Sequence, residues 1–345
     1  MKAIMVALPI LALALSVSSS LAKEDELLTK ARLLFKPLPS VIPSPEGNPS
    51  TPQKVELGRK LFFDPRLSLS EAISCNSCHN ISSYGVDNRE TSLGHKAQEG
   101  SRNAPTVFNA GFHIAQFWDG RAPDLEEQAK GPILNPVEMA EQSGEQVVAK
   151  LKTIPGYRDE FKRAFPSEQD PITYDNIARA IAAFERTLVT PSRFDKFLNG
   201  DVNALSKTER EGLGLFIDKG CSSCHNGVAV GGGMFQKFGV VNPYPYQKDL
   251  GRYEVTKNEA DKYVFKVPSL RNVERTYPYF HNGKVWELKE AIKIMGKTQL
   301  GIDLTDDEAN KIEAFLRSLT GEIPKDALTL PVLPPSSPDT PKPVL

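Results

Sequence analysis

The sequence predicts a mostly α-helical protein composed of two similar domains. Apolar residues recur at three- and four-residue steps in several segments, and no segment shows a convincing run of the alternating pattern of a half-buried strand. The motif C-x-x-C-H occurs twice, at residues 75–79 and at residues 221–225. The segments that follow the two motifs resemble each other, which is typical of a repeated module.

The first domain is expected to contain a first helix near Pro52. Residues 37–52 are rich in proline and should therefore form an extended segment over the surface. Thr51 can cap the helix, and proline suits its first position. A second strong helix should follow Thr173 and end before Pro191, where we place the domain boundary.

The second domain should contain two helices that begin with capping boxes. Ser206 and Thr305 are each followed three residues later by a glutamate, a pattern in which the two side chains satisfy backbone donors of the first turn. Gly321 should end the last helix. Residues 324–345 are rich in Pro, Ser and Thr, so this tail is either disordered or strapped along the surface.

Composition indicates a globular protein. The 345 residues are 40% hydrophobic, which allows a substantial core, and the length favours two domains over one. The formal net charge of -1 provides no field for holding a phosphate backbone. Nucleic acid is therefore not an expected partner.

The first 22 residues have the features of a secretory signal peptide. Lys2 precedes a short apolar stretch, and Ser20, Leu21 and Ala22 form a small-residue cleavage site. A membrane anchor is the weaker alternative, because the apolar run is shorter than the ~20 residues that span a bilayer, and no later segment is apolar enough to span. The expected parts are a signal peptide at 1–22, an N-terminal domain at 23–190, a C-terminal domain at 191–322 and a tail at 323–345.

Each C-x-x-C-H motif is the attachment signature of haem c. The two thiols add to the haem vinyl groups, and the adjacent imidazole becomes the proximal ligand of the iron. Two disulfides or a zinc site are less consistent with two copies of one motif that use all four cysteines. The residues assigned to the first haem are Cys75, Cys78 and His79, and those assigned to the second are Cys221, Cys224 and His225.

The repeat aligns without a gap when Pro105 is placed on Pro268. Each half is therefore expected to be a copy of one haem module, and the differences between the copies should show what each haem does. The alignment pairs Phe117 with Phe280, Trp118 with His281, Gly120 with Gly283 and Leu125 with Leu288.

The sixth iron ligand decides whether a haem stores an electron or admits a substrate. In the second repeat, Met295 is a candidate thioether ligand, although a methionine is as often an ordinary core residue. The matching position of the first repeat is Pro132, which cannot ligate, and this asymmetry favours ligation by Met295. Ligation by histidine and methionine raises the potential and suits an electron store.

The first repeat contains His95 and Glu138 as candidate site residues. A single loop histidine is usually a surface residue, and a single glutamate usually lies on an exposed helix face. Cleavage of a peroxide, however, needs a base that takes a proton from the bound oxygen and returns it to the leaving oxygen. A carboxylate near the haem could do this if burial raised its pKa.

From about residue 52 to residue 321, the chain resembles the bacterial di-haem cytochrome c peroxidases. The matching segments, besides both haem motifs, are the loop with His95, R-N-A-P-T at 102–106, F-W-D-G-R at 117–121, Gln128, N-P-x-E-M with Glu138, T-P-S-R-F-D at 190–195, H-N-G at 281–283 and Met295. The resemblance implies two cytochrome c-like domains, each with one covalently bound haem c.

The resemblance also implies a division of roles between the haems. The N-terminal haem would be the low-potential, peroxidatic one, with His95 as a removable sixth ligand. The C-terminal haem would be the high-potential one, with His225 and Met295 as its ligands. Glu138 and Gln128 would line the peroxide pocket.

Three further expectations follow from the same resemblance. Trp118 would lie between the haems, although ordinary core packing explains an aromatic residue there equally well. A calcium ion would be held by Asn103 and by the backbone oxygens of Thr276 and Pro278, since calcium prefers oxygen ligands. The protein would reduce hydrogen peroxide to water in the periplasm as a homodimer, with electrons from a small soluble donor such as a c-type cytochrome or a cupredoxin.

Two other functions compete with this interpretation. Di-haem enzymes that modify a protein substrate form a sister group, in which a tyrosine replaces the distal methionine; Met295 argues against that group here. A di-haem electron carrier without a substrate would need a strong-field ligand on both irons, and it would leave Glu138 and Gln128 without a role.

Overall fold

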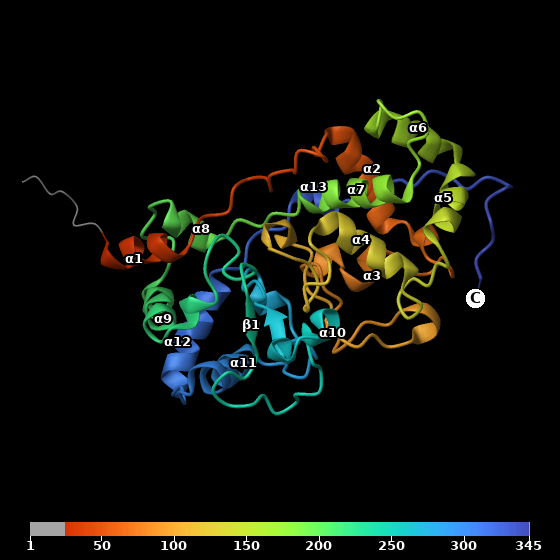
Figure 1. Ribbon diagram of the computed structural model, residues 1–345. Coiled ribbons are helices and arrows are strands. Elements are labelled where there is room, and N and C mark those ends of the chain that lie inside the picture. Colours follow the sequence, from red (N-terminus) through yellow and green to blue (C-terminus); the bar gives the residue numbers. More distant parts are fainter. Residues whose placement is uncertain (1–24, 345) are drawn as a thin grey trace, which may run out of the picture.

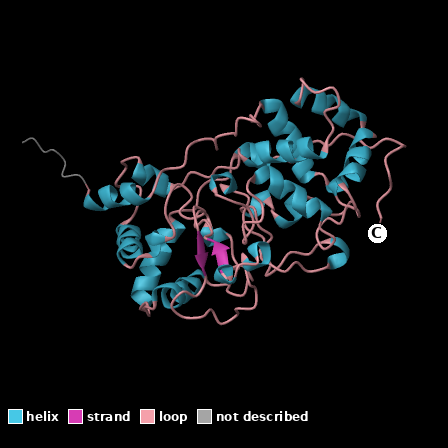
Figure 2. Ribbon diagram, in the orientation of Figure 1, coloured by secondary structure: helices cyan, strands magenta, loops and turns pink. Residues whose placement is uncertain are grey.

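The computed structural model describes residues 25–344, and the predicted signal peptide at 1–22 lies outside the described residues. Figure 2 shows helices and loops with one small sheet, which confirms the mostly α-helical prediction. Within residues 25–344, no helix has both the length and the apolarity that a bilayer crossing requires. The elements are α1 (Glu26–Leu34), α2 (Pro52–Phe63), α3 (Cys75–Cys78), α4 (Leu125–Leu134), α5 (Gly144–Lys152), α6 (Pro155–Ala164), α7 (Tyr174–Glu185), α8 (Arg193–Leu198), α9 (Lys207–Asp218), β1 (Phe235–Lys237), α10 (Tyr253–Thr256), β2 (Val264–Lys266), α11 (Leu288–Met295), α12 (Asp306–Arg317) and α13 (Lys325–Leu328).

The four predicted helix starts are found at the predicted residues. Thr51 caps α2 by accepting a hydrogen bond from the backbone N–H of Lys54 (3.3 Å), and Thr173 caps α7 in the same way. Ser206 and Thr305 form complete capping boxes at α9 and α12. These side chains satisfy donors that a helix terminus leaves free, which is why local sequence was sufficient to locate the helices.

The helices pack into two hydrophobic cores, one in each half of the chain. In the first core α2 crosses α7, and the rings of Phe62 and Phe184 meet edge to face with centroids 5.4 Å apart. In the second core α9 crosses α12, and Phe216 packs against Phe315 at 5.3 Å. Figure 1 shows the two helix pairs in separate regions of the molecule. The boundary residue near Pro191 stays a prediction.

The first helix and the small sheet differ from the sequence prediction. The helix expected to be the first is preceded by α1, which is capped by Asp25 and packs on the second core through Leu28 and Phe35. Its sequence signal is weak because Asp25 caps it without a capping box. The antiparallel pair of β1 and β2 was also not expected, since strands of three residues are too short to display an alternating pattern.

The C-terminal tail is strapped along the first half of the molecule. The backbone N–H of Val344 donates to the carbonyl of Leu69 (2.9 Å), and the hydroxyls of Thr153 and Thr340 are hydrogen-bonded at 3.0 Å. Ala327 of α13 is buried in the first core. Of the two alternatives for the tail, the structure therefore has the strapped one.

The internal repeat is visible in the backbone. Helices α4 and α11 begin at Leu125 and Leu288, the two positions that the sequence alignment pairs. Before each helix, the paired Phe117 and Phe280 both have a left-handed backbone, with φ of 65° and 70°. This conformation is uncommon for residues other than glycine. Its occurrence at matched positions indicates that the halves follow one chain path.

A glycine allows the main helices to touch in each core. A Cβ atom at Gly58 of α2 would lie 1.8 Å from the carbonyl oxygen of Ala180 in α7. A Cβ atom at Gly212 of α9 would lie 1.8 Å from the carbonyl oxygen of Lys311 in α12. Neither crossing leaves room for a side chain, so both crossings depend on glycine.

The halves face each other through matched positions of the repeat. The backbone N–H of Asn103 donates to the carbonyl of His281, and the backbone N–H of Lys266 donates to the carbonyl of Trp118, each at 2.8 Å. Asn103 and Lys266 occupy equivalent positions, as do Trp118 and His281. Such reciprocal contacts are the mark of a two-fold arrangement. The two halves are therefore related by an approximate two-fold axis at this contact.

A buried hydroxyl joins the halves at the end of the first core. The Oγ1 atom of Thr190 accepts hydrogen bonds from the amides of Asn109 (2.9 Å) and Asn272 (2.8 Å), a further matched pair. All three residues are fully buried. Across the contact, Arg102 of the first half also pairs with Asp249 of the second at 2.6 Å.

We predict opposite effects of alanine at two glycines of α9. Gly212→Ala should lower the free energy of unfolding by about 1–3 kcal/mol or more, because its Cβ overlaps the backbone of α12. Gly214→Ala is the matched control, since nothing lies within 4 Å of its Cβ, and it should stabilise by up to about 1 kcal/mol through helix propensity. Denaturant unfolding of both variants measures this. Equal effects would contradict the close crossing.

Candidate haem sites

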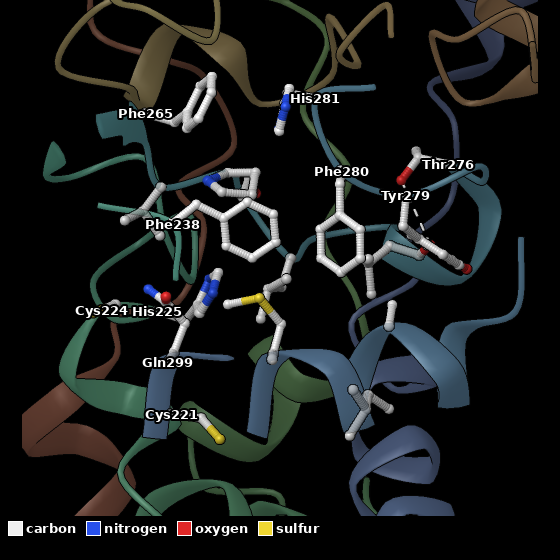
Figure 3. A pocket seen from close by; sticks show the side chains of 18 of the residues that line it. Cys221, Cys224, His225, Phe238, Phe265, Thr276, Tyr279, Phe280, His281 and Gln299 are labelled. Atoms are coloured by element: carbon white, nitrogen blue, oxygen red, sulfur yellow. Dashed lines mark hydrogen bonds between the residues drawn. The ribbon is translucent and has the colours of Figure 1, made fainter. Parts of the chain in front are cut away.

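An apolar cavity in the second half contains the second cysteine motif. Its volume is about 230 Å³. Cys221, Cys224 and His225 line it together with Met295, so the predicted axial pair shares one cavity with the two thiols. Figure 3 shows Cys221, Cys224 and His225 among the lining side chains, together with the rings of Phe238 and Phe280.

Local structure places each of these side chains. The motif follows α9 directly, and Gly220 makes the turn into it with a left-handed backbone, φ 93°. Met295 is the last residue of α11, and a π-helical turn, Gly296–Leu300, follows it. Such π turns are frequent at functional sites because they redirect the side chains next to them. The repeat predicted the equivalence of α4 and α11, and only the packing of α11 brings Met295 to the motif.

The first motif forms the short helix α3, which a capping box of Ser74 and Ser77 opens. Burial raises the pKa of the Cys78 thiol to about 11, and the negative charges of Asp87 and Glu138 add to the rise. Glu138 therefore acts electrostatically on a residue of this motif. The family resemblance implied that Glu138 lies near the first haem, and its effect on Cys78 is consistent with this.

The residues of both motifs fit a covalently held haem. All four cysteines are free thiols, and burial raises the pKa of Cys75 and raises that of Cys221 to about 11. Burial also lowers the pKa of His79, and lowers that of His225 to about 4, which keeps each imidazole neutral as an iron ligand must be. In the second half, Cys221, Cys224 and His225 lie in a cavity lined by aromatic and aliphatic side chains, which suits a flat apolar macrocycle.

Glu138 lies in a turn after α4 and is partly buried. Burial raises the pKa of its carboxyl group, and the positive charge of Arg121 and the amide of Asn135 oppose the rise. The Nδ2 atom of Asn135 donates to Oε1 of Glu138 at 2.8 Å. Gln128 lies half-buried on α4, and within the described residues its side chain has no hydrogen bond to Glu138.

The loop of His95 is attached to the Glu138 turn. The backbone N–H of His95 donates to the carbonyl of Glu138 at 2.8 Å. A Cβ atom at the preceding Gly94 would lie 2.0 Å from the carbonyl oxygen of Val137, so only glycine permits this approach. His95 is buried, and its Nδ1 atom has no hydrogen-bond partner among the described residues. The two candidate residues of the first repeat are thus held in one place.

Trp118 lies at the contact between the halves. Its indole Nε1–H donates to the carbonyl of Asn103 at 2.9 Å, and its ring meets that of His281 at a centroid distance of 6.3 Å. Trp118 and His281 both line the cavity of the second motif. The repeat had paired these two residues in sequence, and the fold places them against each other.

The three residues predicted to hold calcium all line this cavity. Asn103, Thr276 and Pro278 all contribute to its lining, and the side-chain amide of Asn103 donates to the carbonyl of Arg89 at 2.9 Å. Within residues 25–344, no cluster of three or more His, Cys, Asp or Glu side chains could hold a metal ion. A cation at this place would therefore depend on amide and carbonyl oxygens.

Several residues of the sites were not identified from the sequence. Asn135 and Arg121 surround Glu138, and Lys266 and His113 line the cavity of the second motif. A signal existed for Lys266, because it is the repeat counterpart of Asn103 and differs from it in charge. Nothing in the local sequence of Arg121 or His113 indicates which residues they face.

Comparisons with known proteins identify relatives along most of the chain. The family model described as di-haem cytochrome c peroxidase matches residues 52–203, and the model described as cytochrome c matches residues 210–320. The cytochrome c551 peroxidase of Pseudomonas aeruginosa is 51% identical over 97% of this chain and 98% of its own length. The cytochrome c551 peroxidase of Nitrosomonas europaea is 55% identical over 85% of this chain and 87% of its own length.

A solved structure has the same architecture. The crystal structure of a MauG-like protein associated with microbial copper homeostasis superposes with a TM-score of 0.77 and is 31% identical. The match covers 85% of this chain and 98% of that protein. The same arrangement of two modules thus occurs in this MauG-like protein.

We predict that Asn135→Ala raises the pKa of Glu138 further. A hydrogen bond to a carboxylate favours its charged form, so loss of the Asn135 amide should shift the titration to higher pH. Infrared difference spectra recorded across pH can follow the carboxyl band, with Glu138→Gln as the reference that identifies it. A pKa equal to or below that of the unsubstituted protein would show that Asn135 does not stabilise the carboxylate.

Proposed function

The chain belongs to the di-haem cytochrome c peroxidase family, and we propose that its two halves divide the reduction of hydrogen peroxide between them. The enzyme is an oxidoreductase that acts on hydrogen peroxide, as the names of relatives at 51% and 55% identity state for those proteins. Each C-x-x-C-H motif would hold one haem c; the haems would carry the electrons, and the iron of the first haem would bind peroxide. The first half contains the peroxidatic site, and the second half stores an electron.

The observation that carries this proposal is the difference between the two sites. In the second half, Met295 shares the cavity of His225 and can fill the sixth position with sulfur. In the first half, the position equivalent to Met295 is Pro132 in the last turn of α4, which offers no ligand. A haem closed by histidine and methionine has a high potential, whereas a haem with a displaceable ligand can bind peroxide. The second site would therefore store an electron, and the first site would bind and cleave peroxide.

Glu138 is the proposed acid-base group of the first site. Burial raises the pKa of its carboxyl group, so that it can both accept a proton from peroxide and return it to the leaving oxygen. Asn135 holds Oε1, which leaves the second carboxylate oxygen for the substrate. Gln128 on α4 is proposed to complete the polar lining of the peroxide pocket.

His95 is proposed to be the removable sixth ligand of the first haem. Its backbone N–H donates a hydrogen bond to the carbonyl of Glu138. A movement of the loop would therefore displace the imidazole of His95 and at the same time change the surroundings of the Glu138 carboxylate. Lys96 and Ala97 follow it with left-handed backbones, φ 55° each, which are unfavourable for residues with a side chain.

Electrons arrive singly, whereas peroxide needs two. A small c-type cytochrome or a cupredoxin is the proposed donor, and the name cytochrome c551 peroxidase of two relatives is consistent with a cytochrome. The donor would fill the second haem first. Trp118 lies between the halves and is the proposed connection for transfer to the first haem.

Three further features are proposed for the mature protein. A calcium ion would be held by the side-chain oxygen of Asn103 and the carbonyls of Thr276 and Pro278. The predicted signal peptide would direct the chain to the periplasm. A homodimer is proposed by analogy with the family alone.

Modification of a protein substrate is the second candidate, because the MauG-like structure shares the fold at 31% identity. The chain is more similar to the two peroxidases, and Met295 occupies the position at which the sister group has tyrosine. An electron carrier is the third candidate. Adding peroxide to half-reduced protein tests it, since a carrier would show an unchanged Soret band.

We predict that Glu138→Ala slows peroxide turnover by about 10²-fold or more, with both haem spectra nearly unchanged, because a general acid-base group is lost. A base works only when deprotonated, and the pKa of Glu138 is raised. In the unsubstituted enzyme, kcat/KM should therefore fall as pH drops through a value above the ordinary carboxyl range. Glu138→Gln should abolish this acidic limb. Full turnover in either variant would show that Glu138 has another role.

We predict that Met295→Leu lowers the potential of one haem and leaves the other unchanged. Loss of the thioether removes the ligand that stabilises the reduced iron. Ile292→Leu on the same helix is the control, because it also alters the apolar lining but removes no possible ligand. A redox titration followed by absorption measures both potentials. If Met295→Leu gave the original two values, Met295 would not be a ligand.

A further inference from the structure

A buried lysine lines the cavity of the second motif. Lys266 is the last residue of β2 and is only 5% exposed. Among the described residues that line this cavity, none is an aspartate, glutamate or arginine, and Lys266 is the single lysine. An ammonium group thus faces a space without a counter-charge.

The surroundings of Lys266 make this burial unfavourable. Burial lowers the pKa of its ammonium group to about 8, and no carboxylate of the described chain lies within ion-pair distance to oppose this. Lys150, which is similarly buried, is 2.6 Å from Glu141. A charge taken out of water without a partner is costly, so Lys266 requires an anion that the polypeptide does not provide.

The neighbour of Lys266 is a histidine from the other half of the molecule. The Nζ atom of Lys266 lies 3.4 Å from Nδ1 of His113, which also lines the cavity. When Nδ1 accepts from the lysine, the proton of the neutral ring is on Nε2. That Nε2 atom is buried and has no partner among the described residues. Two donors, one from each half, therefore lack an acceptor at one wall of the cavity.

We propose that Lys266 and His113 bind a propionate carboxylate of the haem held by Cys221 and Cys224. A haem carries two propionates, and a carboxylate provides both the negative charge that Lys266 lacks and an acceptor for the Nε2–H of His113. The inference rests on the haem attachment proposed above and not on peroxide reduction. Lys266 and His113 are then positioning residues, which act on the iron through the macrocycle.

The position of Lys266 gives this contact a second consequence. The backbone N–H of Lys266 donates a hydrogen bond to the carbonyl of Trp118, and its side chain contacts His113. The proposed propionate therefore lies at the junction of the two halves. The ammonium offsets the negative charge of the propionate. Reduced iron carries less positive charge than oxidised iron, so it is favoured when that negative charge is neutralised. Lys266 therefore helps to keep the potential of the electron-storing haem high.

The potential of the second haem tests this proposal in the holoprotein. Lys266→Gln should shift the reduction equilibrium of this haem about tenfold towards the oxidised form, which is a decrease of about 59 mV for a one-electron couple. Lys237→Gln removes the same charge from the exposed neighbouring strand β1 and should cause a much smaller shift. A Lys266→Gln protein with two haems and an unchanged potential overturns the proposal.

Stability provides an independent readout with a definite sign. If no anion met the ammonium, Lys266→Met would relieve an uncompensated charge and stabilise the holoprotein. The proposal predicts the opposite, a lower midpoint of unfolding that Lys266→Arg restores. A Lys266→Met holoprotein as stable as the unsubstituted protein overturns the proposal.

Loss of holoprotein can be interpreted with the arginine variant. If the Gln or Met variant does not accumulate with haem, recovery of both haems and of the potential in Lys266→Arg supports the charge pair, and failure of that variant to recover them overturns it. A haem count on the unsubstituted protein separates this proposal from its premise. Fewer than two covalent haems would overturn the attachment itself, whereas two haems with an unchanged potential in Lys266→Gln would overturn only the role of Lys266.

Discussion

Equivalent residues of the two repeats meet across one buried contact, and the remaining arrangement depends on this contact. Asn103 and Lys266 each donate a backbone hydrogen bond to the ring-bearing residue of the opposite half, His281 or Trp118. Thr190 accepts from the matched amides of Asn109 and Asn272 beside it. Because buried polar groups are costly when unpaired, these bonds permit essentially one placement of the halves. The cavity of the second haem motif is lined by residues of both halves at this junction.

Because the two halves share one backbone arrangement, the side chains at equivalent positions can be compared directly. Where the backbone is equivalent, a difference in side chain has a direct consequence for chemistry. In the alignment of the two repeats, Met295 corresponds to Pro132, Lys266 to Asn103 and His281 to Trp118. The second half thereby has a thioether and a buried positive charge, which both favour a reduced haem, and the first half has neither at these positions. These differences are the basis of the proposal that one half stores an electron and the other binds peroxide.

The first site couples its two candidate residues through the backbone instead of through side chains. His95 is bonded by its N–H to the carbonyl of Glu138, and Gly94 packs directly against the preceding peptide. A ligand loop and an acid-base group that share a turn cannot move independently. With the roles proposed above for His95 and Glu138, a movement of the His95 loop would also change the surroundings of the Glu138 carboxylate.

The sequence by itself determined the helical class, the two haem motifs, the repeat and the helix starts at Thr51, Thr173, Ser206 and Thr305. Each of these depends on contacts within a few residues or on comparison of one half with the other, so the information is local or internal to the chain. Helix α1 and the strands β1 and β2 were not predicted. A single capping residue is a weak helix signal, and strands of three residues are too short to show alternating hydrophobicity.

Only the tertiary structure decided which distant residues share a cavity. The pairing of Lys266 with His113, the attachment of His95 to Glu138 and the close helix crossings at Gly58 and Gly212 each join segments far apart in the chain. No periodicity encodes such contacts, since they arise from packing two cores and then docking them. The resemblance to a family indicated the residues of the sites, whereas the burial and the missing counter-charge that give Lys266 its proposed role are properties of the folded chain alone.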